Sequence, residues 1–417
     1  MSTQDAIART LAEDYNAREV GQLPFCHEGF LAMIKNRLMT PGPTQVPEQA
    51  LLALAKQITH HRTPEFVNLL KEAVEGLKYV FQTTGDVIVL TSSGTGAMEA
   101  AVTNLVPRGG KVIVLEAGRF AQRWGEICQA YGIEAIRHKV EWGQAVEPDD
   151  VATLLEQHPD AVAVFGTLME SSTGVGHDVK AIAQVVSQSK TLFVVDGISG
   201  AGVMECRTEE WGIDMLIVGS QKALMLPPGL AFIAASEAAW QQMDKVQPQA
   251  FYFDLKQHRK KIKDGPDTPW TPAHTLVAAL VENLRLIRAE GMESIWAKAK
   301  TLSKATRAGI EAIGLEVFAQ RPADGLTAIR IPTGVDGSKF TKLLESRYGV
   351  KVAGGQSHLK GKIFRVAHMG IVDELDILAT LSAIELVLDE LGKPVEFGAG
   401  PGAACKVLAE SRAAAVA

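Results

Sequence analysis

Lys222 stands at a position in this sequence that suits a reactive amine. It follows a short apolar run, residues 215–218, and precedes a Pro-Pro-Gly turn and a second apolar run, residues 230–235. Short apolar runs bounded by turns predict buried strands. Because removing an ammonium group from water is costly, Lys222 either forms a Schiff base with a carbonyl cofactor or extends its ammonium group to the surface from a strand end.

Asp196 is a second candidate group, and it ends another predicted strand. The run 192–195 is apolar, and Gly-Ile-Ser-Gly follows the carboxylate. A carboxylate at the end of a buried strand needs a cationic or hydrogen-bonded partner. A protonated pyridine nitrogen is one such partner, and the backbone of the following turn is the other.

A turn of small residues, Ser92-Ser93-Gly94-Thr95-Gly96, follows a predicted strand and opens a helix. Exposed backbone N–H groups, the positive end of the helix and two hydroxyls predict a phosphate site, with an ordinary N-cap as the alternative. The turn is not a dinucleotide-binding motif, because Glu99 stands in place of its third glycine. It is not a P-loop either, since no Gly-Lys-Ser/Thr follows.

The segment that carries these groups alternates β-branched runs with longer amphipathic stretches. Strands are predicted over residues 87–91, 111–116, 161–166, 192–196 and 215–218, with helices between most of them. This alternation predicts an α/β domain with a mainly parallel sheet covered on both faces. In such sheets ligands gather at the carboxyl ends of the strands.

A second, smaller domain of the α+β class is predicted toward the C-terminus. A helical pattern over about residues 273–313 leads into it, and strands at 326–331 and 363–367 alternate with helices at 338–348 and 373–391. The predicted divisions are an N-terminal arm at 1–38, a large domain at 39–290, a small domain at 291–395 and a Gly- and Ala-rich tail at 396–417.

Pro-Gly-Pro-Thr at 41–44 predicts an ordered extended loop that lines a pocket or simply joins elements.

The composition favours small-molecule chemistry in a reducing compartment. A net charge of -6 and scattered Lys and Arg residues argue against a nucleic-acid surface. The four cysteines lie far apart with no CxxC pair, so neither a zinc site nor a disulfide framework is expected, and no metal site is predicted. No apolar run approaches a membrane span, and the first residues lack the order of a signal peptide. A cytoplasmic protein that is not bound to a membrane is expected.

Taken together, the motifs resemble those of the fold type I pyridoxal phosphate enzymes, and within them the class V aminotransferases of the serine–glyoxylate, alanine–glyoxylate and aspartate type. The resemblance covers roughly residues 39–395. It rests on motifs that occur in order along the chain, namely Pro-Gly-Pro-Thr at 41–44, Ser-Gly-Thr-Gly-Ala-Met-Glu-Ala at 93–100, Glu-Ser-Ser-Thr-Gly-Val at 170–175, Val-Asp-Gly-Ile-Ser at 195–199, Gly-Ser-Gln-Lys-Ala-Leu-Met-Leu-Pro-Pro-Gly at 219–229 and Phe-Arg-Val-Ala-His-Met-Gly at 364–370.

The resemblance implies a large domain with a seven-stranded type of sheet, pyridoxal 5'-phosphate as cofactor, and a homodimer with shared active sites. Lys222 would carry the cofactor as an aldimine, and Asp196 would pair with its pyridine nitrogen. Arg365 would bind the substrate carboxylate, with Gly42 and Ser171 lining the same pocket. The other implied cofactor-binding residues are Ser93, Gly94, Thr95 and Gln221 at the phosphate, Phe120 stacked on the ring, Ser171 near its phenolic oxygen, Ile198 beside Asp196, and Thr268 and Thr271 reaching across the dimer interface.

The resemblance also has departures and rival functions. Phe120 stands where some relatives have Trp or Tyr, and Ser199-Gly200 stands where the family commonly has Ser-Ser. The expected reaction moves the amino group of serine, alanine or aspartate to glyoxylate or pyruvate. A cysteine desulfurase-like lyase on the same fold would need a mobile cysteine in the small domain, and residues 315–395 contain none. A non-catalytic subunit of a larger complex is the third alternative, but no cysteine set here could bind iron or nickel.

Overall fold

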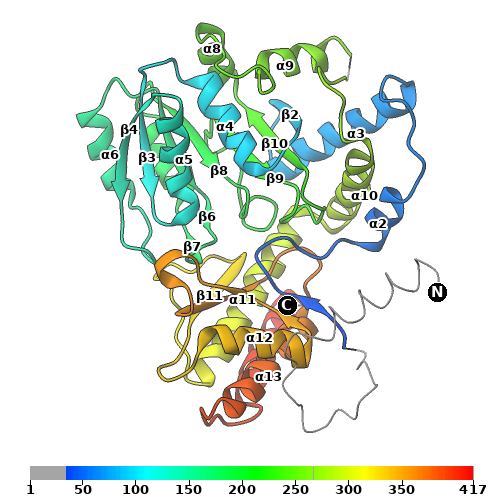
Figure 1. The fold of residues 1–417 in the computed structure, drawn as a ribbon, viewed down its shortest axis with the longest axis vertical. Coiled ribbons are helices and arrows are strands. Elements are labelled where there is room, and N and C mark those ends of the chain that lie inside the picture. The colour runs from blue at the N-terminus through cyan, green and yellow to red at the C-terminus, as the bar shows by residue number, and fades with distance from the viewer. Residues whose placement is uncertain (1–33, 266, 417) are drawn as a thin grey trace, which may run out of the picture. The chain divides into compact units, whose positions relative to one another are not determined.

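The computed structural model describes residues 34–265 and 267–416, and the account below is limited to them. The predicted N-terminal arm lies outside the described residues, apart from residues 34–38. Within the described chain, the largest sheet has seven strands in the order β2-β10-β9-β8-β5-β3-β4 (Figure 1). Its strands are β2 (Asp86–Thr91), β3 (Lys111–Glu116), β4 (Glu134–Lys139), β5 (Ala163–Thr167), β8 (Leu192–Asp196), β9 (Met215–Gly219) and β10 (Leu230–Ala235).

The seven-stranded sheet is mainly parallel, as the sequence predicted. β10 runs antiparallel to its neighbours β2 and β9, and every other neighbouring pair is parallel. Since β10 separates β2 from β9 and opposes both, β2 points the same way as the parallel strands. The carboxyl ends of β2, β9, β8, β5, β3 and β4 therefore lie along one edge of the sheet.

Helices cover both faces of this sheet because most of its strands carry apolar side chains on both faces. On β2, for example, Val87 and Val89 face one core cluster while Ile88 and Leu90 face the other, which is the alternation expected of a strand buried on both sides. The first cluster includes residues of α2 (Glu48–Leu54), α3 (Pro64–Phe81), α6 (Pro148–Gln157), α7 (Val179–Val186) and α10 (His274–Glu290). The second includes residues of α4 (Gly94–Leu105), α5 (Arg119–Ala130), α8 (Glu237–Lys245) and α9 (Leu255–Lys263).

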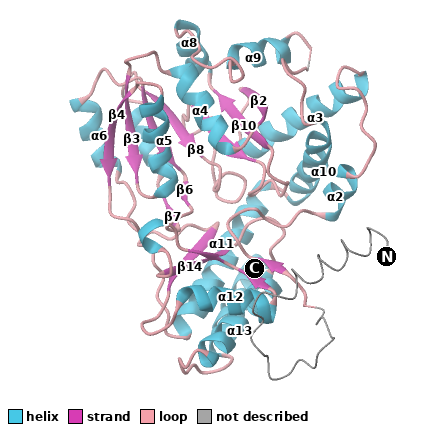
Figure 2. Cartoon of the chain, viewed as in Figure 1, coloured by secondary structure: helices cyan, strands magenta, loops and turns pink. Residues whose placement is uncertain are grey.

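The C-terminal part is built around a smaller antiparallel sheet in the order β11-β14-β13, and Figure 2 labels its middle strand, β14. Phe340, Phe364 and Leu381 lie in its core, and Met39 joins them from the other end of the chain. The elements of this part are α11 (Met292–Ala312), β11 (Leu326–Arg330), α12 (Gly337–Tyr348), β12 (Val350–Lys351), β13 (Ala353–Gly354), η1 (Ser357–Leu359), β14 (Ile363–Ala367), α13 (Glu374–Glu390) and α14 (Ala399–Val416), while β1 (Arg37–Leu38) pairs with β12 and β6 (Met169–Glu170) with β7 (Val175–Gly176). The predicted division near residue 290 stays a prediction.

Two expectations need correction in this part of the chain. The helical pattern predicted over 273–313 is two helices, α10 and α11, because Gly291 between them adopts a positive φ of 84° that a continuous helix does not allow. The segment predicted as a tail forms α14. Its first N–H groups donate to the buried carboxylate of Glu385, from Gly398 and Gly400 at 2.8 Å each, and Ala404 and Leu408 are buried in the core.

The physical reason for α14 lies partly in its composition and partly in its packing. Alanine has the highest helix propensity, and proline is tolerated in a first helical turn, where Pro401 stands. The Gly and Ala residues at the start of the segment suggested a tail. The sequence does not show that α14 packs against α11 and α13, and this packing makes it part of the fold. Neither α14 nor any other helix within the described ranges is both long and apolar enough to cross a membrane.

Candidate active site

Five of the predicted site residues follow strands whose carboxyl ends share one edge of the seven-stranded sheet. Asp196 ends β8, and Lys222 comes shortly after β9. Ser93 follows β2, Phe120 follows β3 and Ser171 follows β5 after the short strand β6. Parallel strand order thus brings together side chains that are separated by more than a hundred positions in the sequence, which is the usual place for a ligand site in an open α/β sheet.

Lys222 lies beneath the Pro41–Thr44 loop. Its Nζ donates a hydrogen bond to the carbonyl oxygen of Pro41. The loop is held there by Thr44, whose N–H donates to the Gln221 carbonyl at 3.2 Å and whose Oγ1 donates to the Lys222 carbonyl at 2.9 Å. A Cβ at Gly42, which has a φ of 107°, would lie 2.6 Å from Lys222 Nζ. Only glycine therefore allows the loop to approach the lysine this closely.

The pKa of Lys222 is lowered from its ordinary value of 10.5 to about 8. Burial is the largest cause, because it disfavours the ammonium form. The nearby positive charge of Arg365 lowers the pKa further, and the carboxylate of Asp196 acts in the opposite direction. An amine with such a pKa is deprotonated in a substantial fraction of molecules near neutral pH, which is the form that can act as a nucleophile or a base.

Asp196 is buried, and its carboxylate accepts a hydrogen bond from the Ile198 N–H at 2.8 Å. Burial raises its pKa to about 7. The Ile198 hydrogen bond opposes this shift, the charge of Glu170 adds to it, and Arg123 and Lys222 oppose it more weakly. The residues around Asp196 thus supply less positive charge than a buried carboxylate needs, so a cationic group placed against it would be stabilised.

Arg365 projects from β14 away from the C-terminal core. Its neighbours Phe364 and Val366 pack into that core, so strand alternation directs the arginine to the opposite face. Arg365 is 5% exposed. Its Nε and Nη2 donate to the Gly354 carbonyl at 3.1 and 2.7 Å, and its Nη1 donates to the Ser171 carbonyl at 2.6 Å. Burial lowers its pKa to about 10, and Glu170 opposes that shift.

The small-residue turn after β2 begins α4 with Ser93 at the N-cap position. The Ser93 side chain makes no capping hydrogen bond within the described chain. Gly94 lies against Ile198, because a Cβ at Gly94 would be 2.5 Å from Ile198 Cδ1. Thr95 Oγ1 accepts a hydrogen bond from Arg123 Nη1 at 2.9 Å. Gln221 Oε1 is buried and has no hydrogen-bond partner among the described residues. A buried acceptor of this kind is stabilised when a donor is placed against it.

Glu170 is a buried carboxylate that the sequence did not single out. It accepts hydrogen bonds from the backbone N–H groups of Phe120 and Ala121 at 3.1 and 2.9 Å. It also accepts from the N–H and Oγ of Ser172 at 3.0 and 2.7 Å. Burial raises its pKa, and these hydrogen bonds oppose the shift. Glu170 therefore joins the start of α5 to the turn that holds Ser171, where Ser171 Oγ accepts from Ser199 Oγ at 3.3 Å.

Arg123 is the second residue that the sequence did not single out. It lies on α5 three positions after Phe120, and its Cζ is 5.2 Å from the centre of the Phe120 ring. Residues three apart on a helix share a face, so the spacing in Gly-Arg-Phe-Ala-Gln-Arg-Trp was the available signal. The spacing within the chain did not reveal the role of Glu170, because two of its four hydrogen bonds come from Phe120 and Ala121, about fifty positions earlier.

Thr268 and Thr271 do not join this cluster within the chain. The hydroxyl of Thr268 donates to the Trp270 carbonyl at 2.7 Å, and Thr271 is exposed. Both line a small pocket near the end of β2, together with Thr91 and Trp270. Within the described residues, no hydrogen bond joins either threonine to Lys222, Asp196 or Arg365.

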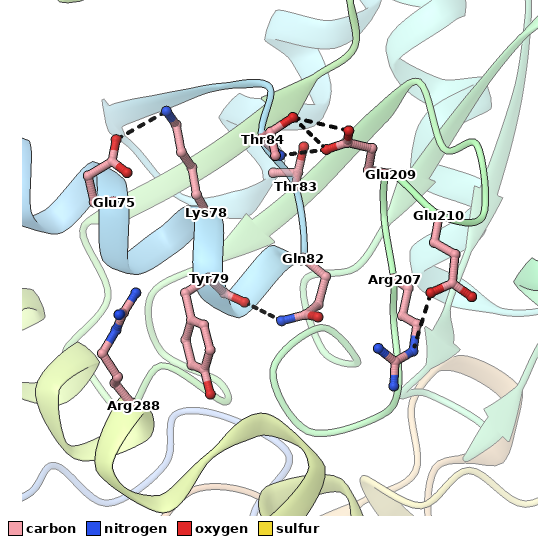
Figure 3. A pocket seen from close by; sticks show the side chains of 10 residues that line it. All are labelled: Glu75, Lys78, Tyr79, Gln82, Thr83, Thr84, Arg207, Glu209, Glu210 and Arg288. Carbon is pink, nitrogen blue, oxygen red and sulfur yellow. Dashed lines mark hydrogen bonds and ion pairs between the residues drawn. The ribbon is translucent and has the colours of Figure 1, made fainter.

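A larger pocket lies away from the cluster, on the surface, with a volume of about 690 Å³ (Figure 3). Several of its charged groups interact with neighbours, since Lys78 pairs with Glu75 at 3.1 Å and Glu209 accepts hydrogen bonds from Thr84. Glu75, Lys78, Tyr79, Gln82, Thr83, Thr84, Arg207, Glu209, Glu210 and Arg288 line the pocket. Lys222, Asp196 and Arg365 are not among them, so the pocket in Figure 3 is not the candidate site.

Comparisons with known proteins agree on one family. The profile of the family described as Aminotransferase class-V matches residues 38–370. The chain is 41% identical to a soluble hydrogenase small subunit from Synechococcus sp., covering 90% of this chain and 98% of that protein. It is 33% identical to an L-aspartate–glyoxylate aminotransferase from Paracoccus denitrificans, covering 91% and 98%. Among solved structures, the ureidoglycine–glyoxylate aminotransferase from Bacillus subtilis matches with a TM-score of 0.85 at 28% identity, covering 91% and 100%.

Proposed function

This chain belongs to the class V aminotransferase family, and from that premise we propose that it moves the amino group of serine, alanine or aspartate to a keto acid such as glyoxylate or pyruvate. The observation that carries the proposal is the combination of Lys222, which is partly buried, and the buried Asp196 at one edge of the large sheet with the buried Arg365, which comes from β14 and donates to the Ser171 carbonyl at 2.6 Å. An amine that loses its proton near neutral pH, a carboxylate that lacks a cation and a buried guanidinium are the groups that transamination of an amino acid requires.

The family uses pyridoxal 5'-phosphate, and the residues of this site fit that cofactor. Asp196 would pair with its pyridine nitrogen, a cation that would relieve the shortage of positive charge around the carboxylate. Gln221 would donate to the phosphate from its amide Nε2, and Ser93, Gly94 and Thr95 would supply N–H and O–H groups at the start of α4. Phe120, Ser171 and Ile198 would contact the ring. When bound, the cofactor supplies an electron sink for the α-carbon of the substrate.

Lys222 has two proposed tasks. Its Nζ would hold the cofactor when no substrate is present, and the same amine would accept the proton from the α-carbon of the substrate. The pKa of about 8 suits both tasks, because the amine accepts a proton readily and is still unprotonated in part of the molecules at neutral pH. Gly42 keeps the loop above Lys222 free of a side chain.

Arg365 is proposed to bind the α-carboxylate, the group that amino donor and keto acceptor share. Its contacts with the carbonyl oxygens of Gly354 and Ser171 hold the guanidinium in place. The N–H groups that remain can bind a carboxylate in the planar fork that arginine provides. Within the described chain Arg365 has no carboxylate partner in ion-pair range, so its charge is available to a substrate.

We also propose a homodimer in which Thr268 and Thr271 reach the cofactor phosphate of the other subunit. An exposed aromatic group beside them supports an interface, since the ring centres of Phe251 and Trp270 are 4.9 Å apart and those of Tyr252 and Trp270 are 6.0 Å apart. Phe251 is 76% exposed in the single chain, and exposed aromatic residues are enriched at protein interfaces. The proposed location is the cytoplasm, which suits the buried free thiols of Cys128 and Cys206.

The two alternatives find less support in the structure. A cysteine desulfurase-like lyase would require a reactive thiol near Lys222. Of the cysteines that the structure describes, Cys128 and Cys206 are buried with pKa values raised to about 12, and Cys405 lies on α14. A non-catalytic role as a subunit of a larger complex is suggested by the printed name of the Synechococcus relative alone. A non-catalytic role would not account for an amine and a carboxyl group whose pKa values both lie near neutral pH.

A panel of amino donors against glyoxylate, pyruvate and oxaloacetate tests the proposal. The purified protein should carry a visible absorption band that serine, alanine or aspartate diminishes and that the correct keto acid restores. Transfer from at least one of the three donors to glyoxylate is expected. A protein that takes up pyridoxal 5'-phosphate but transfers no amino group from any donor in the panel would contradict the proposal.

A further inference from the structure

Arg123 is a charged residue of the site that the proposed function leaves without a task. It is half-buried on α5 and donates through Nη1 to Thr95 Oγ1 at 2.9 Å. Its guanidinium also lies over the Phe120 ring, 5.2 Å from the ring centre. Arg123 therefore touches two residues that would hold opposite parts of a cofactor, one at its phosphate and one on its ring.

The charge of Arg123 lacks a close counter-ion in the part of the chain that the structure describes. Arg119, one turn earlier on α5, pairs with Glu126 at 2.8 Å, whereas no carboxylate lies in ion-pair range of Arg123. Its guanidinium faces the start of α4, where the helix dipole is also positive. Two positive features directed at one point favour an anion there, and a phosphate monoester carries close to two negative charges at neutral pH.

The hydrogen bond between Arg123 and Thr95 also determines how the threonine hydroxyl is used. A hydroxyl has a single hydrogen to donate and lone pairs that accept. Because Thr95 Oγ1 accepts from Arg123, its hydrogen is left for an acceptor on another group, and the charged donor strengthens that outgoing hydrogen bond. No acceptor for the Thr95 hydroxyl is found among the described residues. Arg123 thus donates to Thr95, and Thr95 is left with a hydrogen that an anion could accept.

We infer that Arg123 is a positioning residue for the cofactor phosphate: it orients the Thr95 hydroxyl as a donor and adds the positive charge that the start of α4 alone does not provide. This inference rests on the proposed cofactor. It differs from a purely structural role in a specific way. A structural role would support Phe120 and the ring, so it would affect cofactors with and without a phosphate equally, whereas a role at the phosphate depends on that group.

The experiment compares equilibrium binding of pyridoxal 5'-phosphate and of pyridoxal, which lacks the phosphate, to the cofactor-free full chain. Arg123→Met should raise the Kd for pyridoxal 5'-phosphate by about 10- to 100-fold, as expected for loss of a hydrogen bond that involves charge. The Kd for pyridoxal should change less than about twofold. Arg119→Met, on the same helix and in a surface ion pair, is the matched control and should leave both values unchanged.

A double-mutant cycle sharpens the test and guards against a variant that folds poorly. If Arg123 acts through Thr95, then Arg123→Met and Thr95→Val should be less than additive when combined, because each removes the same hydrogen-bond chain. Arg123→Lys provides a second variant that keeps the charge, and it should fall between parent and Arg123→Met. Equal losses for pyridoxal and pyridoxal 5'-phosphate, or full additivity with Thr95→Val, would overturn the inference. A parent protein that does not bind pyridoxal 5'-phosphate would instead overturn the proposed cofactor as well.

Discussion

Two regions of this molecule bring lysine, arginine and carboxylate side chains close together, and the pKa values of these side chains are shifted by different causes in the two regions. At the strand ends, burial is the largest cause of every shift, since it raises the pKa of Asp196 and lowers those of Lys222 and Arg365. In the surface pocket of Figure 3, hydrogen bonds to neighbours are the largest causes, and they lower the pKa of Glu209 and raise that of Arg207.

The difference shows why the surface pocket is not the reactive one. In the surface pocket, the hydrogen bonds of Glu209 and Arg207 stabilise their charged forms, so the pKa of each moves further from neutral pH. At the strand ends, the amine and the carboxyl are withdrawn from water and titrate near neutrality. Groups whose pKa values are perturbed by burial cluster at functional sites. Matched substitutions in the two regions test this contrast.

The largest effect is expected for Lys222→Ala. Removing the amine removes both the covalent anchor for the cofactor and the base at the α-carbon, so transamination should fall by more than about 10⁴-fold while the fold is retained. Lys78→Ala, in the surface pocket, should leave the rate within about twofold. Steady-state assays with the best donor and glyoxylate measure both, and a Lys222→Ala protein that transaminates at the parental rate would refute the central assignment.

Arg365→Ala should have the next largest effect. Loss of the guanidinium should lower kcat/KM for donor and acceptor alike by roughly two to three powers of ten, about 3 to 4 kcal/mol, because both substrates carry the same carboxylate. Arg365→Lys should be intermediate, since it keeps the charge and loses the fork. The control Arg288→Ala in the surface pocket should not change either value. An Arg365→Ala protein with unaltered affinity for the donor would leave the carboxylate without its proposed partner.

Asp196→Asn should slow the reaction by more than about tenfold, or about 1.4 kcal/mol, because a neutral amide does not hold the pyridine nitrogen of the cofactor in its protonated form. Cofactor binding should be retained in the variant. Glu209→Gln is the matched control from the surface pocket. Single-turnover measurements with the donor in excess compare the proton-transfer step in the three proteins, and a loss smaller than tenfold would argue against pairing between Asp196 and the ring nitrogen.

The last of these effects is on stability and not on the reaction rate, and it concerns how the stability of the cofactor-free protein depends on pH. The pKa of Asp196 is about 7 in the folded protein, above its ordinary 3.8. The folded state therefore holds this proton more tightly, so the contribution of Asp196 to stability is most favourable below about pH 4 and declines as the pH rises to about 7. Lys222, with a pKa lowered to about 8, loses its contribution as the pH falls from 10.5 to 8 and adds no slope below that range.

Asp196→Asn should remove the slope that this carboxyl causes. The free energy of unfolding of the variant should exceed that of the parent by an amount that grows between pH 4 and 7 and reaches on the order of a few kcal/mol. Urea unfolding of both cofactor-free proteins at several pH values measures the difference. If the two stabilities differ by a constant amount across this range, Asp196 does not titrate near neutrality in the folded protein.

Much of the large sheet was predictable because its central strands are buried on both faces. The predicted strands at 111–116 and 192–196 coincide with β3 and β8, and the others differ by one or two residues at their ends. β4 was not predicted, since it is an edge strand whose sequence, Glu-Ala-Ile-Arg-His-Lys, is mostly polar. The break at Gly291 was missed for a different reason. A single glycine between two amphipathic segments does not reveal its φ.

The sequence by itself determined the mainly parallel sheet and the placement of Lys222 and Asp196 at strand ends, because both follow from short apolar runs and the turns that end them. Only the tertiary structure decided which groups surround these two residues. The Pro41 carbonyl reaches Lys222 from 181 positions away, and Glu170 and Arg123 act on Asp196 from different strands and helices. Burial and neighbouring charges set a pKa, and both depend on distances in space that spacing along the chain does not encode.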